Sequence, residues 1–298
     1  MSAENAAYDP PYRGALHNSI DQRSTSLRRM PAPAGWEEGS VEAISVKSVA
    51  VKSERKYSLF TKCVAEFLGD LTFVFIGTMQ GYGRGTVDGT VHAALAHGFA
   101  IFILVTTLGH ISGGHFNPAV TWSVVASGRQ NPLELPFYWA SQLFGGFCGS
   151  MLACAILSYD EMVQVQAGAT LLFEGDPSNL DNSAWWQGLL SETVVTFFLC
   201  HTILMTAVDT DKNLLAPLAI GFTLSIDILA TGAITGASMN PARSFGPNVA
   251  ASILINKGDQ ADHLWSRHYI YWAGPLVGAS IAAAIYRIFE ARTDRFVR

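Results

Sequence analysis

The chain begins with a polar stretch and continues as a series of long apolar segments. Residues 1–56 are rich in Ser, Ala, Pro and charged residues and show no sustained hydrophobic period, which predicts a disordered tail. Six segments follow that are each long enough to cross a bilayer as a helix. They lie at roughly 59–79, 91–109, 136–157, 187–208, 214–233 and 268–289. The pattern predicts an all-α membrane protein with six transmembrane helices.

Two shorter apolar stretches open with the same three residues. They are Asn117-Pro118-Ala119 and Asn240-Pro241-Ala242. Proline fits the first turn of a helix because the N–H that it lacks has no partner there, and Asn is a favoured cap. About ten residues separate the first box from Gly128, and Gly246-Pro247 is expected to break the second run. Neither run can cross roughly 30 Å of hydrocarbon, so both predict half-length helices.

The two halves of the apolar region repeat each other. Asn240 follows Asn117 by 123 positions, and Glu192 follows Glu66 by 126. An odd number of spans in each half inverts the second half relative to the first. The two half-helices are therefore expected to enter from opposite faces and to meet near the middle of the membrane. The predicted repeats cover about 58–157 and 185–290.

Composition and charge support a membrane protein and indicate its orientation. Hydrophobic residues make up 49% of the 298 residues and charged residues 14%, which is too apolar for a soluble domain. The net charge of −5 argues against nucleic acid as a partner. Fifteen of the 19 Lys and Arg residues fall on the side of the two termini, which predicts cytosolic termini. No metal or cofactor is expected, because the four cysteines lie in apolar segments without ligand spacing.

The paired boxes resemble those of the major intrinsic protein family, the aquaporins. The second box extends to Asn-Pro-Ala-Arg-Ser-Phe-Gly-Pro, and the resemblance covers roughly 58–290. It implies the aquaporin fold: six transmembrane helices plus two half-helices in an inverted repeat, over a channel domain at 57–290. A cytosolic tail at 291–298 would follow. The stretch from Ile226 to Ala230 and the glycines before the first box are most similar to the aquaporin-8 type. The family also implies a homotetramer with one pore in each subunit.

The centre of the channel is predicted at the two Asn residues. Facing helix N-termini place two positive dipole ends at the midplane, which repels cations. Asn117 and Asn240 can donate N–H groups to the oxygen of a passing water molecule, and a water molecule held in this way cannot relay a proton. The alternative is that both residues serve only as helix caps.

The narrow filter is mapped from the resemblance. It falls on His97, Ile228, Ala237 and Arg243. Many water-selective relatives have Phe, His, Cys and Arg at these places, so here the His has moved to the second span. Glycerol-conducting relatives have an Asp and a Pro-Leu pair where this chain has Phe245 and Tyr271-Trp272. The alternative for His97 is a residue packed between helices.

Several other polar residues lie in or near the spans. The resemblance implies that Glu66 and Glu192 accept hydrogen bonds from the half-helix loops, and a proton relay is the alternative. It also implies that His115 lines the pore, with a packing role as the alternative. Gly113 and Gly114 are predicted to line the pore with it. Three further residues have no assigned role: Asp70, His201 and Asp227.

The predicted function is a passive channel for water and small neutral solutes, with ammonia or hydrogen peroxide among them, that excludes protons and ions. The protein would be a multi-pass protein of the plasma membrane or an intracellular membrane, embedded in the lipid bilayer. A secondary transporter, which also uses inverted repeats, and a weakly conducting structural membrane protein are the alternatives. An enzyme is not expected, because no nucleophile and base are paired in the sequence.

Overall fold

The computed structural model describes residues 57–82, 89–172, 185–209 and 213–290, and these residues contain helices and no strand. The predicted tails at 1–56 and 291–298 lie outside the described residues. Six long helices match the six predicted spans. They are α2 (Leu59–Met79), α3 (Gly89–Ser112), α5 (Leu135–Cys154), α7 (Trp185–Ile203), α8 (Ala216–Thr235) and α10 (Ile270–Glu290), and a π-helical turn (Leu204–Val208) extends α7.

Four of these helices are long and apolar enough to cross a membrane by length and composition: α3, α7 with its π-helical turn, α8 and α10. Helix α2 has 21 residues, as α10 does, but contains Lys62, Glu66 and Asp70. Helix α5 is rich in glycine and polar residues. Glu66 and Asp70 are fully buried, so the polar positions of α2 face the interior of the bundle. The two carboxylates of α2 thus mark interior contacts, while Lys62 is partly exposed and pairs with Glu134.

The two predicted half-helices are present as α4 (Pro118–Ala126) and α9 (Pro241–Leu254). The prediction that Gly246-Pro247 breaks the second helix is wrong, because α9 continues to Leu254. A proline inside a helix removes one backbone hydrogen bond. Packing on α5 supports the helix at this point: a Cβ atom at Gly246 would lie 2.4 Å from the Gly146 carbonyl carbon. With 14 residues, α9 is still too short to cross the bilayer.

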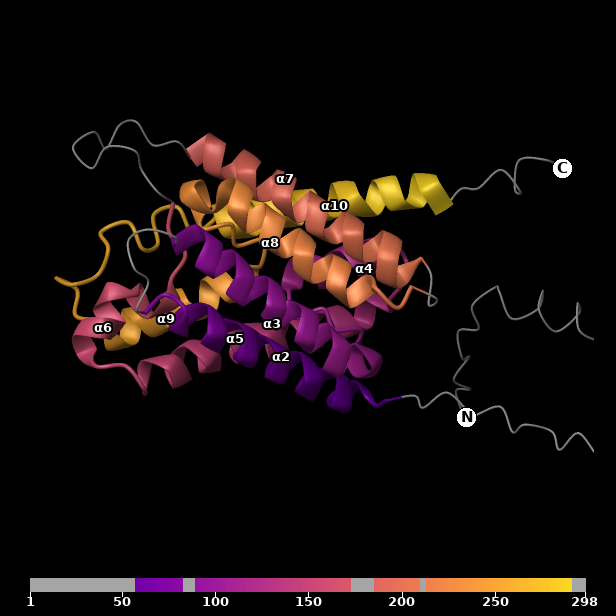
Figure 1. Cartoon of the computed structure of the whole chain (residues 1–298). Coiled ribbons are helices and arrows are strands. Elements are labelled where there is room, and N and C mark those ends of the chain that lie inside the picture. Colours follow the sequence, from indigo (N-terminus) through magenta and orange to yellow (C-terminus); the bar gives the residue numbers. More distant parts are fainter. Residues whose placement is uncertain (1–56, 83–88, 173–184, 210–212, 291–298) are drawn as a thin grey trace, which may run out of the picture. The chain divides into compact units, whose positions relative to one another are not determined.

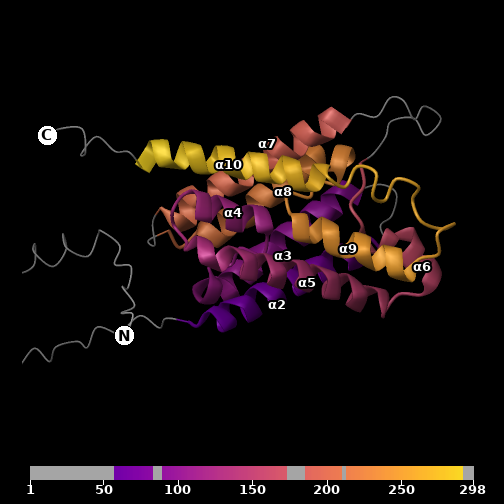
Figure 2. The ribbon, with the colours of Figure 1, turned by 180° about the vertical axis from the view of Figure 1, so that it is seen from behind.

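Each half-helix packs on a long helix of the other half of the bundle. Helix α2 packs on α5, and its counterpart α7 packs on α10, while α3 and α8 pack on each other. The half-helix of each half packs on the last long helix of the other half, α4 on α10 and α9 on α5. Figures 1 and 2 show α4 and α9 towards opposite ends of the bundle. This arrangement brings the N-terminal ends of α4 and α9 together.

Glycines allow the closest helix pairs to form. A Cβ atom at Gly149 of α5 would lie 2.3 Å from the carbonyl oxygen of Leu71 in α2. A Cβ atom at Gly278 of α10 would lie 2.2 Å from the carbonyl oxygen of Thr193 in α7. Small residues are used in this way where helices associate in lipid, because backbone contact replaces hydrophobic burial as the source of packing energy. The equivalent pairs of both repeats are therefore built alike.

Three short helices complete the described part: η1 (Pro132–Glu134), α6 (Tyr159–Gln164) and η2 (Gln166–Gly168). Ser158 caps α6 in a capping box with Glu161. The chain then turns at Ala167 and Gly168, which both have positive φ, and runs back to Leu172 along the bundle. This turn carries Thr170 to the side chain of Arg243.

Candidate functional site

The two boxes start their helices in the predicted way. The side-chain oxygen of Asn117 accepts a hydrogen bond from the Ala119 N–H at 2.8 Å. The side-chain oxygen of Asn240 accepts from the N–H groups of Ala242 at 2.9 Å and Arg243 at 3.2 Å. The prediction that both Asn residues are N-caps is confirmed.

Each Asn also reaches across to the loop of the other box. The Asn117 side-chain amide donates to the carbonyl oxygen of Met239 at 2.8 Å. The Asn240 amide donates to the carbonyl oxygen of Phe116 at 2.7 Å. An Asn amide carries two hydrogens, and this bond uses one of them. The reciprocal pair fixes the two helix N-termini opposite each other in the centre of the bundle.

A buried carboxylate holds the loop before α4. One oxygen of Glu66 accepts from the Ser112 hydroxyl at 2.5 Å and from the His115 N–H at 3.1 Å. The other oxygen accepts from the Phe116 N–H at 2.6 Å and the Gln142 amide at 2.8 Å. Phe116 has a φ of +45°, which is unfavourable for a residue with a large side chain. The carboxylate stabilises this backbone conformation.

The loop before α9 is held in the same way. One oxygen of Glu192 accepts from the Thr235 hydroxyl at 2.6 Å and the Ser238 N–H at 2.9 Å, and the other accepts from the Met239 N–H at 2.8 Å. Met239 has a φ of +54° and is the counterpart of Phe116. Both glutamates are fully buried. Their contacts are those that a bracing role requires.

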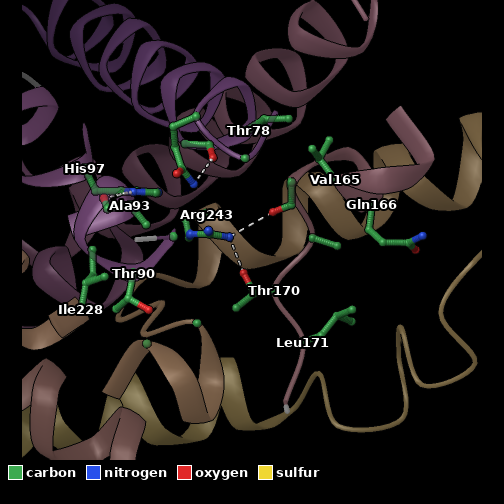
Figure 3. A pocket seen from close by; sticks show the side chains of 18 of the residues that line it. Thr78, Thr90, Ala93, His97, Val165, Gln166, Thr170, Leu171, Ile228 and Arg243 are labelled. Atoms are coloured by element: carbon green, nitrogen blue, oxygen red, sulfur yellow. Dashed lines mark hydrogen bonds between the residues drawn. The ribbon is translucent and has the colours of Figure 1, made fainter. Parts of the chain in front are cut away.

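A cavity of about 240 Å³ lies on the α9 side of the boxes (Figure 3). We call it the α9-side cavity, and His97, Ile228 and Arg243 line it. Ala237, the fourth residue of the predicted filter, is not among the lining residues, and the neighbouring Gly236 is. Three of the four predicted positions thus lie around one cavity, and the role of Ala237 stays a prediction.

Arg243 is held by a loop that the sequence analysis did not identify. Its guanidinium donates to the carbonyl oxygen of Gly168 at 3.1 Å and to the hydroxyl of Thr170 (Figure 3). The Ser244 hydroxyl also contacts Thr170, at 3.1 Å. Thr170 and Gly168 line the same cavity. The sequence holds no local signal for this contact, because the partners are more than 70 positions apart.

His97 belongs to α3, and its ring contacts the backbone of α3 and a side chain of α2. Its Nδ1 is 2.8 Å from the carbonyl oxygen of Ala93. Because a carbonyl only accepts, Nδ1 carries the hydrogen and Nε2 is an acceptor in the neutral ring. The ring of Phe73 meets it edge to face with 5.4 Å between centroids. The side chain is thus both packed between helices and placed at the cavity wall.

A narrower space and a second wide cavity follow towards α4. The central cavity has a volume of about 20 Å³, and Asn117 and Asn240 line it together with apolar residues such as Phe73. The α4-side cavity has a volume of about 270 Å³. His115 and Gly114 line both spaces, and Gly113 lines the second. The predicted pore residues His115, Gly113 and Gly114 therefore each line at least one of these two cavities.

The residues without an assigned role are buried or packed against rings. Asp70 is fully buried beside Glu66 and the side chain of Asn240. Asp227 is also buried. His201 stacks on Phe197 with 5.6 Å between ring centroids. Asp70 therefore lies at the boxes, and Asp227 interacts electrostatically with Glu192, which holds the loop before α9.

The fold and the site define a class of protein. Two half-length helices meet head-on between wider cavities inside a bundle of long apolar helices with inverted repeats, which is how a channel is built across a membrane.

Comparison with known proteins identifies the family. The model of the major intrinsic protein family matches residues 53–286. A probable aquaporin TIP-type RB7-18C from Nicotiana tabacum is 42% identical over 234 residues, which cover 75% of this chain and 84% of the relative. Aquaporin-8 from Rattus norvegicus is 39% identical over 229 residues, which cover 76% and 80%. The chain belongs to the major intrinsic protein family.

A solved structure supports the fold. The X-ray structure of the aquaglyceroporin from Plasmodium falciparum matches with a TM-score of 0.64 at 21% identity, covering 78% of this chain and 98% of that chain. At this identity the likeness concerns the fold alone. The aquaporin fold predicted from the paired boxes is confirmed. The protein is a multi-pass membrane protein from a family of channels for water and small solutes.

Proposed function

We propose that the protein is a passive channel that conducts water and excludes protons and ions. The observation that carries this proposal is the pair of Asn amides at the facing N-termini of α4 and α9. Each amide has a second hydrogen beside the central cavity, and a water molecule that accepts both hydrogens points its own hydrogens away from the centre. The positive ends of two helix dipoles repel cations at the same place.

The α9-side cavity supports a further selection step. Arg243 is always charged and repels cations, and its guanidinium can replace part of the hydration of a neutral solute. His97 and Ile228 stand across the same cavity. One wall is therefore polar and another is aliphatic, which favours small neutral solutes that are slightly larger or less polar than water. We infer that ammonia and hydrogen peroxide pass as well, ammonia as neutral NH₃.

Orientation and assembly follow from charge and family. Arg129 and Arg287 lie at the ends of α4 and α10 nearest the α4-side cavity, and the positive-inside rule places this side in the cytosol. Both termini are then cytosolic. We propose, from the family alone, a homotetramer in which each subunit holds one path.

The test is transport by the purified protein in liposomes. Stopped-flow light scattering should show water permeability above that of empty liposomes, with a low activation energy. A pH-sensitive dye inside the same vesicles should show no proton flux above the lipid background. Water or solute flux that requires a sodium or proton gradient would identify a coupled transporter. Water permeability equal to that of empty liposomes would favour a structural membrane protein.

A further inference from the structure

The inference concerns Gly77, a buried residue of α2 at the α9-side cavity. Gly77 lies against the imidazole of His97: a Cβ atom added at position 77 would stand 2.6 Å from Nε2 and 3.4 Å from the two adjacent ring carbons. Both residues line the same cavity. Non-bonded carbon contacts lie near 3.5–4.0 Å, so any larger residue at position 77 must displace the ring.

The ring is held on two other sides. Its Nδ1 hydrogen is donated to the carbonyl oxygen of Ala93 at 2.8 Å, and the ring of Phe73 lies edge to face beside it. The open space next to the ring is the cavity, with Ile228 and Arg243 on its wall (Figure 3). A methyl group at position 77 therefore moves the imidazole into this space.

The second repeat provides an internal comparison. The counterpart of Gly77 in α7 is Ile203, 126 positions later, and the counterpart of His97 in α8 is Ile220, 123 positions later. Both isoleucines line the central cavity and the α4-side cavity. Where the facing residue is aliphatic, the chain has a full side chain at the position of Gly77. Glycine occurs where the facing residue is the bulkier imidazole.

We propose that Gly77 is a specificity-determining residue of the channel. By having no side chain, it lets the His97 ring lie against α2 and so sets the width of the path between His97 and Arg243. This inference rests on the proposed function, because it requires that His97 borders the path of the solute. It predicts that position 77 controls which solutes pass without contacting them.

The test compares Gly77→Ala with the unmodified protein in liposomes, by stopped-flow swelling for water and by a dye assay for hydrogen peroxide. We expect water permeability to fall at least threefold and the ratio of peroxide to water permeability to fall as well. Alanine favours a helix over glycine, so α2 itself is not weakened. The control is Gly109→Ala in α3, where the added atom meets only Val105, at 3.5 Å, and both permeabilities should stay unchanged.

Two further variants, Gly77→Ala/His97→Ala and His97→Ala, distinguish displacement of the His97 ring from damage to the fold. In the double variant Gly77→Ala/His97→Ala the methyl group has no ring to displace, so water permeability should return to that of His97→Ala, and so should the yield of monodisperse protein. The inference is overturned if Gly77→Ala conducts like the unmodified protein. It is overturned equally if the double variant is folded but stays as slow as Gly77→Ala, or if Gly77→Ala lowers both permeabilities with their ratio unchanged.

The outcome for the unmodified protein keeps this inference apart from the proposed function. Water conduction by the unmodified protein with no effect of Gly77→Ala overturns the role of Gly77 alone. Absence of conduction by the unmodified protein overturns both.

Discussion

The two repeats agree at the boxes. In each, a buried glutamate accepts from a hydroxyl and two consecutive N–H groups, an Asn caps the half-helix, and a tyrosine holds the start of the loop. Tyr138 donates to the carbonyl oxygen of Ser112 at 2.7 Å, and Tyr271 donates to that of Thr235 at 2.9 Å. The centre is thus a duplicated scaffold. Its symmetry supports a task that has no preferred direction, such as the exclusion of protons from a water file.

The repeats differ on the walls next to the boxes. On the α9 side stand Arg243 and His97, and their counterparts 123 positions away are Val120 and Ile220. Both aliphatic counterparts line the central cavity. At these two pairs of positions the polar side chains are therefore present on the α9 side only. The comparison separates a symmetric centre from an asymmetric α9-side cavity, which we propose as the filter, and variants can disrupt the two parts independently.

Removing one buried glutamate should have the largest effect. In Glu192→Ala three donors lose their acceptor, and each buried unpaired group costs about 1–3 kcal/mol. We expect the yield of folded protein in detergent to fall, as measured by size-exclusion chromatography, and the Tm to fall with it. Glu134→Ala is the control, because this partly exposed carboxylate pairs with Lys62 and Gln130 and its loss should cost less than about 1 kcal/mol. Equal losses for both variants would contradict the bracing role.

Replacing Arg243 with the residue at the equivalent position of the first repeat should have the next largest effect. Arg243→Val gives the α9-side cavity the residue found at position 120. We expect the permeability to urea or glycerol to rise at least tenfold while water permeability stays within about threefold, because the charge and the bulk leave together. Solute exclusion by Arg243→Val equal to that of the unmodified protein would place the filter elsewhere.

The replacement of both His97 and Ile228 tests the solute range. In His97→Phe/Ile228→His the aliphatic wall becomes polar and the α3 wall becomes a bulky ring. The ratio of ammonia to water permeability should fall about tenfold, with water conduction retained. In the unmodified protein, ammonia flux should rise with pH towards the pKa of ammonium, because NH₃ is the species that passes. An unchanged ratio in the double variant would mean that these two side chains do not set the selectivity.

Much of the scaffold could be predicted from the sequence because its signals are local. Six long apolar runs, Asn before Pro, and a repeated glutamate each indicate one structural feature without knowledge of the rest of the chain. The contacts that could not be predicted depend on packing between distant segments. Helix α9 continues through Pro247 because it packs on α5, and Thr170 reaches Arg243 because a loop folds back over the bundle. Both contacts join residues without any local pattern.

The cysteines allow a smaller test of the path. None of Cys63, Cys148, Cys154 and Cys200 lines the three cavities described. Mercurial reagents should therefore reduce water permeability by less than about 20%, and Ala237→Cys should create a block that a thiol reverses. Ala237→Cys also decides whether position 237 faces the path, because Gly236 and not Ala237 is among the residues that line the α9-side cavity. Strong block of the unmodified protein would show that another thiol borders the path.

The smallest effect is expected at the connection that carries Thr170. Hydrogen bonds from the Tyr82 hydroxyl and the Ser158 N–H lower the pKa of the Glu161 carboxyl from its ordinary value. A carboxyl with a lowered pKa in the folded protein contributes stability above the unfolded pKa of about 4.3, and this stability is lost as the pH falls through the folded pKa. The Tm of Glu161→Gln should therefore lie slightly below that of the unmodified protein at neutral pH, and the two should converge in acid. Water permeability should not change, because Glu161 caps α6 and lines none of the three cavities described. A Tm difference that persists at the same size well below pH 4 would show that the carboxylate charge is not what stabilises this connection.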